Sequence, residues 1–114
     1  MLKTIPEIIA KARETLNTIT AADAAVKCKS ENGIIIDVRE PAEFNEKSAS
    51  GAINIPRGLL EMTMLKKHPN EDLAIFIHCA TGARATLSAE QLTRLGYKNV
   101  WVITSMLDDV CCVF

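Results

Sequence analysis

The segment Leu73–Ile77 is the most apolar run of the chain, and a helical pattern over residues 84–95 follows it after one short loop. A short apolar run of this kind, preceded by the turn signal Pro69-Asn70, is typical of a strand that is buried on both faces. Such a strand needs helices on each side of its sheet. We therefore expect an α/β fold with a mainly parallel central sheet flanked by helices, in which Leu73–Ile77 lies centrally.

Strand and helix patterns alternate along the rest of the chain, as they do in proteins built from βαβ units. We expect further strands at residues 34–38, 51–56 and 100–103, and further helices at residues 5–16, 21–29, 40–44 and 58–67. No internal repeat, low-complexity tract or long linker interrupts this pattern. Residues 1–19 are expected to form an N-terminal amphipathic helix and lead-in, and residues 20–114 to form one domain.

Charge and composition argue against several classes of partner. The net charge of -1 provides no overall field that would attract nucleic acid or an anionic membrane. The apolar runs are too short to span a bilayer, and the N-terminus lacks the features of a signal peptide. The four cysteines form neither a Cys-x-x-Cys pair nor a zinc pattern. We therefore expect a cytoplasmic location, mostly free thiols and no metal, so that any anion must be bound by a local site.

Cys79 stands where the expected central strand ends and the loop into the next helix begins. In parallel α/β sheets, sites form at the carboxyl ends of strands. The loop N–H groups and the helix N-terminus would point at the sulfur, and this favours a thiolate and an anion beside it. The sequence therefore predicts Cys79 as a catalytic nucleophile acting on an anionic substrate. The candidate substrate-binding residues are those of the loop: Ala80, Thr81, Gly82, Ala83 and Arg84.

Three motifs resemble those of the rhodanese family of sulfurtransferases. They are Asp37–Phe44, Gly51–Pro56, and the Cys79 strand and loop followed by Leu95-Gly96-Tyr97 and Val100-Trp101-Val102. The resemblance covers residues 20–104, and its motifs stand in family order, which is more specific than any single short pattern. It implies the rhodanese-like α/β domain and the transfer of sulfane sulfur from thiosulfate or a persulfide donor to a thiophilic acceptor.

The implied chemistry consists of two displacements at sulfur. The Cys79 thiolate takes the outer sulfur of thiosulfate and becomes a persulfide, and a thiol or cyanide acceptor then removes that sulfur. Arg84 offers a planar cation to an oxyanion. Asp37 and Arg39 support the site as a local pair or through Arg39 bonds to loop carbonyls, or are purely structural. No cofactor is expected, and the partners are a small anionic sulfur donor and a small or protein acceptor.

Three departures from the family pattern are visible. Lys47-Ser48-Ala49 replaces the Gly-His-Ile of many members, and Ala80 stands where several sulfurtransferases have Arg. After Thr104 the chain lacks the usual Gly-Gly pair and Trp-containing helix. We therefore expect the rhodanese-like domain of residues 20–114 to have an atypical or truncated C-terminal end. Cys111-Cys112 is expected to lie in a frayed tail rather than to resolve a persulfide.

Two other functions compete with sulfur transfer. Phosphatases and arsenate reductases of the rhodanese fold use a loop one residue longer between Cys and Arg, whereas Ala80 to Ala83 alone separate Cys79 from Arg84. The shorter loop favours a sulfur atom over a tetrahedral phosphate. The second alternative is a non-enzymatic persulfide carrier or interaction domain, which Ala80 and the altered C-terminal end leave open.

Two further features have an ordinary structural interpretation. His78 should point away from Cys79 if the strand continues through it, so we expect no direct catalytic role for it. The apolar stripe of the helix at residues 5–16 either packs against the body of the domain or forms a homodimer contact.

Overall fold

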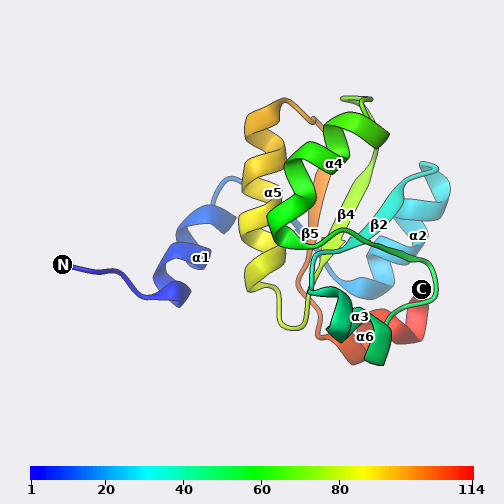
Figure 1. Cartoon of the computed structure of the whole chain (residues 1–114), viewed down its shortest axis with the longest axis horizontal. Coiled ribbons are helices and arrows are strands. Elements are labelled where there is room, and N and C mark those ends of the chain that lie inside the picture. Colours follow the sequence, from blue (N-terminus) through cyan, green and yellow to red (C-terminus); the bar gives the residue numbers. More distant parts are fainter.

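A five-stranded parallel sheet forms the centre of the computed structural model, which describes residues 1–114 (Figure 1). The strand order is β1-β5-β4-β2-β3, and all neighbouring strands are parallel. The central strand is therefore β4, which contains most of the apolar run described above. The α/β class and the parallel sheet are confirmed. The strands are β1 (Asn17–Ile19), β2 (Ile34–Asp37), β3 (Ala52–Asn54), β4 (Ile75–His78) and β5 (Val100–Ile103).

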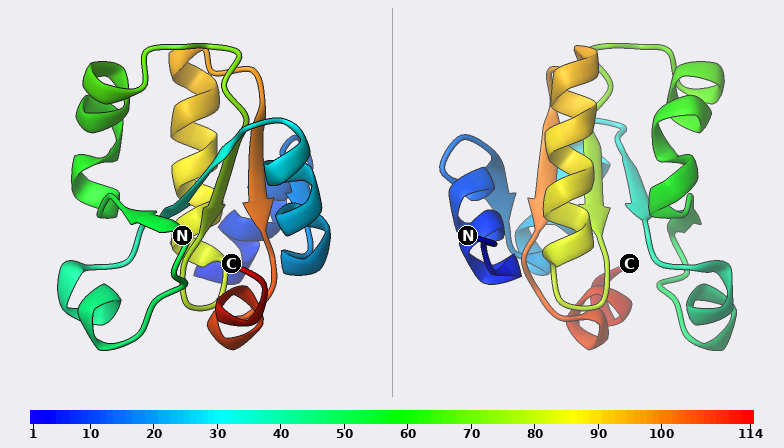
Figure 2. Two further views of the ribbon diagram at one scale, coloured as in Figure 1. Left: turned by 90° about the vertical axis from the view of Figure 1, so that its right-hand side faces the viewer. Right: turned by 60° about the vertical axis from the view of Figure 1, so that its left-hand side comes forward.

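Helices cover both faces of this sheet (Figure 2). Side chains of α4 and α5 pack on one face, and side chains of α2 and α6 pack on the other. None of the helices has the length and apolar character needed to cross a membrane. The helices are α1 (Ile5–Arg13), α2 (Ala21–Ser30), α3 (Pro41–Glu46), the 3-10 turn η1 (Arg57–Leu59), α4 (Leu60–Lys67), α5 (Ala83–Leu95) and α6 (Leu107–Val113).

The N-terminal helix α1 packs against α5 at one side of the molecule (Figure 1). Thr4 and Glu7 cap it reciprocally, as a capping box does. Ile9 and Ala12 are buried, whereas Ile5 remains exposed. The apolar stripe therefore packs on the body of the domain, and a homodimer contact stays a prediction. The helix ends at Arg13, earlier than expected.

The sequence pattern does not predict two of the elements, β1 and α6. The edge strand β1 has three residues, of which Asn17 and Thr18 are exposed, so it carries no apolar alternation. It is held by its pairing with β5. The prediction of a frayed C-terminal tail is wrong. Helix α6 forms there and buries Val110 completely against the sheet. Phe114 follows the helix, and its carbonyl oxygen accepts a hydrogen bond from Ser50 Oγ. A single fully buried residue in a short helix leaves almost no periodic signal.

Candidate active site

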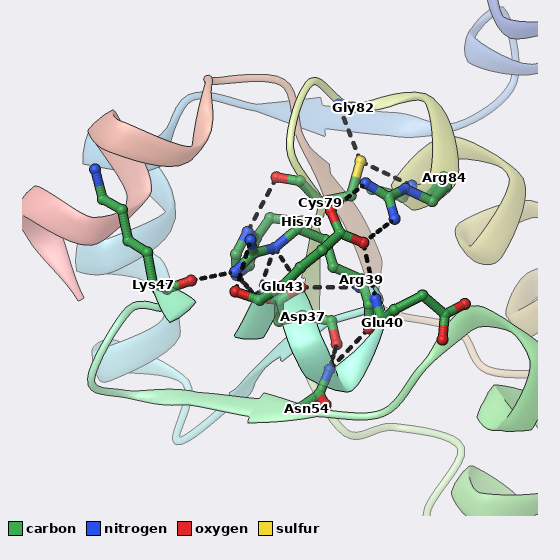
Figure 3. A network of polar contacts seen from close by, with 11 residues as sticks. Asp37, Arg39, Glu40, Glu43, Lys47, Asn54, His78, Cys79, Gly82 and Arg84 are labelled. Atoms are coloured by element: carbon green, nitrogen blue, oxygen red, sulfur yellow. Dashed lines mark hydrogen bonds and ion pairs between the residues drawn. The ribbon is translucent and has the colours of Figure 1, made fainter. Parts of the chain in front are cut away.

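Cys79 lies just beyond the end of β4, with its sulfur at the N-terminus of α5 (Figure 3). The Gly82 N–H donates to Cys79 Sγ at 3.0 Å, and the Ala85 N–H donates to the same sulfur at 3.4 Å. The side chain is only 2% exposed. Two backbone donors and a helix N-terminus thus converge on one sulfur, which favours negative charge on it. Ala85 lies just outside the loop residues that the sequence indicates.

Gly82 shapes this loop through its backbone. Its φ of 106° is left-handed, a conformation that residues with a Cβ adopt at a cost. The Gly82 carbonyl oxygen accepts from Thr86 Oγ1 at 2.7 Å and from Arg13 Nη2 at 3.5 Å. Gly82 therefore directs its N–H to the sulfur while its carbonyl is held by α5 and α1.

We expect Gly82→Ala to weaken both the fold and the site. A Cβ there would lie 2.6 Å from Arg13 Nη2, and although that side chain can move, the left-handed strain of about 1–2 kcal/mol would remain. Displacement of one N–H donor should slow alkylation of Cys79 by iodoacetamide. Urea unfolding and peptide-mapped alkylation measure the two effects. Gly58→Ala is the matched control, because its Cβ would meet nothing within 4 Å. Equal results for the two variants would contradict this role of Gly82.

Arg84, in the first turn of α5, forms an ion pair with Glu43 of α3 (Figure 3). Its two terminal nitrogens donate to the two carboxylate oxygens at 2.7 and 3.1 Å. The hydrogen bonds from Arg84, together with the Glu40 N–H, lower the pKa of Glu43 to about 2. The positive charge beside Cys79 is therefore offset by a carboxylate. Sequence reasoning did not single out Glu43, although it lies within the Asp37–Phe44 motif.

Asp37 and Arg39 form a fully buried ion pair at the end of β2. Arg39 Nη2 donates to Asp37 Oδ2 at 2.8 Å, and Arg39 Nε lies 3.1 Å from both carboxylate oxygens. Arg39 also donates to the carbonyl oxygens of Glu43, at 3.4 Å, and Lys47, at 2.6 Å. The two arrangements considered from sequence, a local pair and bonds to loop carbonyls, occur together. They tie α3 to the strand beside Cys79.

His78 pairs with Asp37 in the register of β4 and β2, and its ring is completely buried. Its Nδ1 lies 3.3 Å from the Cys79 carbonyl oxygen, and its Nε2 lies 3.7 Å from Asp37 Oδ2 without a hydrogen-bond partner. Cys79 packs on the face of the sheet that α4 and α5 cover. Phe76 lies two residues before His78, so both side chains are on the same face, and Phe76 packs on the face that α2 and α6 cover. His78 thus faces away from the sulfur, as the sequence predicts.

Burial lowers the pKa of His78 below its ordinary value of 6.5, although the nearby Asp37 acts in the opposite direction. Below pH 6.5 the imidazole of His78 is protonated in the unfolded chain but stays neutral in the folded chain. The free energy of unfolding should therefore fall as the pH is lowered from about 7 to about 5.5. Urea unfolding at several pH values should show this loss in the wild type and a smaller loss in His78→Gln. His68→Gln, in a partly exposed position, is the control. An unchanged pH dependence in His78→Gln would disprove this assignment.

The loop also contacts the C-terminal helix. The Leu107 N–H donates to the Ala80 carbonyl oxygen at 3.1 Å, so α6 braces the loop despite its departure from the family pattern. A groove of about 300 Å³ lies between α3 and α6 beside this contact, with Glu43, Glu46 and Lys47 among its lining. The structure holds no cluster of three His, Cys, Asp or Glu side chains that could bind a metal ion, and all four cysteines are free thiols.

Comparison with known proteins identifies one family. The sequence profile of the rhodanese-like domain matches residues 20–107. A relative in Schizosaccharomyces pombe named "Putative thiosulfate sulfurtransferase, mitochondrial" is 32% identical, and the match covers 59% of this chain and 55% of that protein. The chain spans from 35% to 62% of the lengths of the four curated relatives it matches.

Solved structures share the fold over most of the chain. A Rhodopseudomonas palustris protein of unknown function, described as a "Possible Tyrosine Phosphatase", is 26% identical with a TM-score of 0.81, covering 96% of this chain and 90% of that one. The polysulfide-sulfur transferase homodimer of Wolinella succinogenes is 25% identical with a TM-score of 0.74, covering 90% of this chain and 78% of that one.

Proposed function

The chain belongs to the rhodanese-like domain family, and on this basis we propose that it is a sulfurtransferase that carries sulfane sulfur as a persulfide on Cys79. The observation that carries the proposal is the pair of N–H donors, from Gly82 and Ala85, at 3.0 and 3.4 Å from Cys79 Sγ. Donors placed in this way stabilise the thiolate both before the first displacement and after the second. Thiosulfate or a persulfide is the proposed donor, and a thiol, cyanide or a protein thiol is the proposed acceptor.

The reaction needs two displacements and no net redox change. In the first, the Cys79 thiolate attacks the outer sulfur of thiosulfate, the new S–S bond forms, and sulfite leaves with the electron pair of the old S–S bond. In the second, the acceptor nucleophile bonds to the outer sulfur of the persulfide, and Cys79 leaves as a thiolate. The Gly82 and Ala85 N–H groups face the atom that carries the charge at the start and end of the cycle.

Hydrolysis of a phosphate ester is a second candidate, since the structure from Rhodopseudomonas palustris is described as a "Possible Tyrosine Phosphatase". The length of the loop argues against it, because Ala80 to Ala83 alone separate Cys79 from Arg84. Arg84 is also held by Glu43 rather than directed as a free cation at the loop. In sulfur transfer only the outer sulfur atom has to enter the loop, whereas a phosphoryl group is attacked at its central atom and needs several donors around its terminal oxygens. Both features therefore suit sulfur transfer better.

Mass spectrometry after exposure to thiosulfate tests the proposed function. We expect the intact mass to rise by one sulfur atom, peptide mapping to place that atom on Cys79, and cyanide to remove it as thiocyanate. Hydrolysis of p-nitrophenyl phosphate without persulfide formation would replace this proposal with a phosphatase. A persulfide that forms but turns over with neither cyanide nor thiols would instead indicate a carrier.

Arg84→Ala should raise the KM for thiosulfate about fivefold with little change in kcat, because an exposed and paired charge contributes about 0–1 kcal/mol. The exposed fractions of the Arg84 and Glu43 side chains are 38% and 39%, so solvent screens both. Glu43→Gln should lower the KM by freeing the guanidinium. Steady-state kinetics with thiosulfate measure both changes. An unaltered KM in Arg84→Ala would show that Arg84 only joins α5 to α3.

A further inference from the structure

Three arginine side chains surround the Cys79 loop, and two of them are neutralised by carboxylates. Arg39 is paired with Asp37, and Arg84 is paired with Glu43. Arg13, at the end of α1, takes part in none of the ion pairs of the structure. Its charge is therefore the uncompensated positive charge at the loop.

Arg13 is held in place by neutral oxygens. Its Nε donates to Thr86 Oγ1 at 3.1 Å, and its Nη2 donates to the Gly82 carbonyl oxygen at 3.5 Å. A guanidinium has five N–H donors, so these two bonds leave about three for a ligand. The side chain is half-buried, and α1 is anchored on α5 through the buried Ile9 and Ala12. The free donors are thus presented from a fixed position.

A groove of about 360 Å³ opens between α1 and the loop, and Arg13 is the one charged residue that lines it. Thr81 and Ala83 form its loop side, and Pro6 and Ile9 are among its apolar residues. The groove on the other side of the loop is lined by the carboxylates of Glu43 and Glu46. The cations of that second groove, Arg39 and Lys47, are paired with Asp37 and Asp108. An anion is therefore favoured on the α1 side of the loop that follows Cys79.

We propose that α1, which lies outside the matched family domain, completes the substrate site, and that its groove selects a small organic thiol carrying a carboxylate as the sulfur acceptor. The carboxylate binds the free N–H groups of Arg13, and the aliphatic part lies against Ile9. The thiolate attacks the outer sulfur of the Cys79 persulfide and forms the new S–S bond, and Cys79 leaves as a thiolate. The choice of acceptor rests on the proposed function, whereas the anion subsite does not.

Alkylation of Cys79 tests the subsite without any sulfur transfer. The ratio of the rates with iodoacetate, an anion, and iodoacetamide, which is neutral, should fall about five- to tenfold in Arg13→Gln and be partly retained in Arg13→Lys. Peptide mapping separates Cys79 from the other cysteines. Lys11→Gln removes the same charge from an exposed position of the same helix and should leave the ratio unchanged. An unchanged ratio in Arg13→Gln would overturn the proposal.

The acceptor is tested with the persulfidated protein and two thiols. Transfer to mercaptoacetate should slow about five- to tenfold in Arg13→Gln, whereas transfer to the neutral 2-mercaptoethanol should not change. Each thiol is compared with itself in the wild type and in Arg13→Gln, so the different intrinsic reactivities of the two thiols do not affect the result. If transfer to both thiols slowed equally, Arg13 would only hold the Gly82 carbonyl, and the proposed selectivity for a carboxylate-bearing acceptor would be overturned. A lowered alkylation ratio in a protein that forms no persulfide would support the anion subsite and reject sulfur transfer.

Discussion

Cys79→Ser is expected to reduce thiocyanate formation from thiosulfate and cyanide by about a thousandfold or more, because loss of a nucleophile removes the covalent route altogether. The serine hydroxyl can occupy the same position between the Gly82 and Ala85 N–H groups, but it does not ionise near neutral pH and is a poor nucleophile toward sulfur. The fold should be preserved, so urea unfolding of the variant should resemble that of the wild type. Initial rates at saturating thiosulfate measure the effect.

The other cysteines supply the control for this experiment. Cys112 is exposed, and its substitution by Ser should leave the rate intact. Cys28 is half-buried, and burial, with a smaller contribution from Glu31, raises the pKa of its thiol, so it should stay protonated and unreactive. Equal rates in Cys79→Ser and the wild type would remove Cys79 from the reaction. A rate that instead depends on Cys112 would place the persulfide in α6.

Arg39→Met is expected to lower the free energy of unfolding by about 3–5 kcal/mol, because it leaves the carboxylate of Asp37 buried and unpaired. Asp37 is 0% exposed and Arg39 is 3% exposed, so solvent cannot replace the lost partner. The variant also loses the hydrogen bonds to the carbonyl oxygens of Glu43 and Lys47, and α3 should loosen beside the loop. Urea denaturation measures the stability, and kcat reports any displacement of the site.

A double-mutant cycle separates the ion pair from the packing of the Arg39 side chain. Asp37→Asn combined with Arg39→Met removes the unpaired charge, so the double variant should be more stable than the sum of the single effects implies. Lys98→Met is a surface comparison, since Lys98 and Glu71 are 64% and 61% exposed, and their pair should contribute little. If the changes in the free energy of unfolding caused by Asp37→Asn and Arg39→Met were strictly additive, the two side chains would not be energetically coupled.

The contacts near Cys79 differ in how far apart along the chain their residues lie. The loop after β4 and its glycine are local features, and the pair of Asp37 and Arg39 joins residues two positions apart. Such contacts follow from the strand–loop–helix order and from residue type. The pair of Arg84 and Glu43 spans 41 positions, and the bond from Arg13 to Thr86 spans 73. No short motif carries information on these contacts, so the pairing of Arg84 with Glu43 is visible only in the structure.

The amino-acid sequence is enough to predict the α/β class, the central position of β4 and the placement of Cys79 at a strand end, because these depend on hydrophobic periodicity and local turn residues. It did not reveal β1 or α6, which are held by pairing with β5 and by the burial of Val110. Which arginine at the loop lacks a carboxylate partner is a property of the tertiary structure. That outcome depends on which carboxylates the packing of α1, α3 and α5 brings within hydrogen-bonding distance, since charge compensation is set by proximity in space and not in sequence.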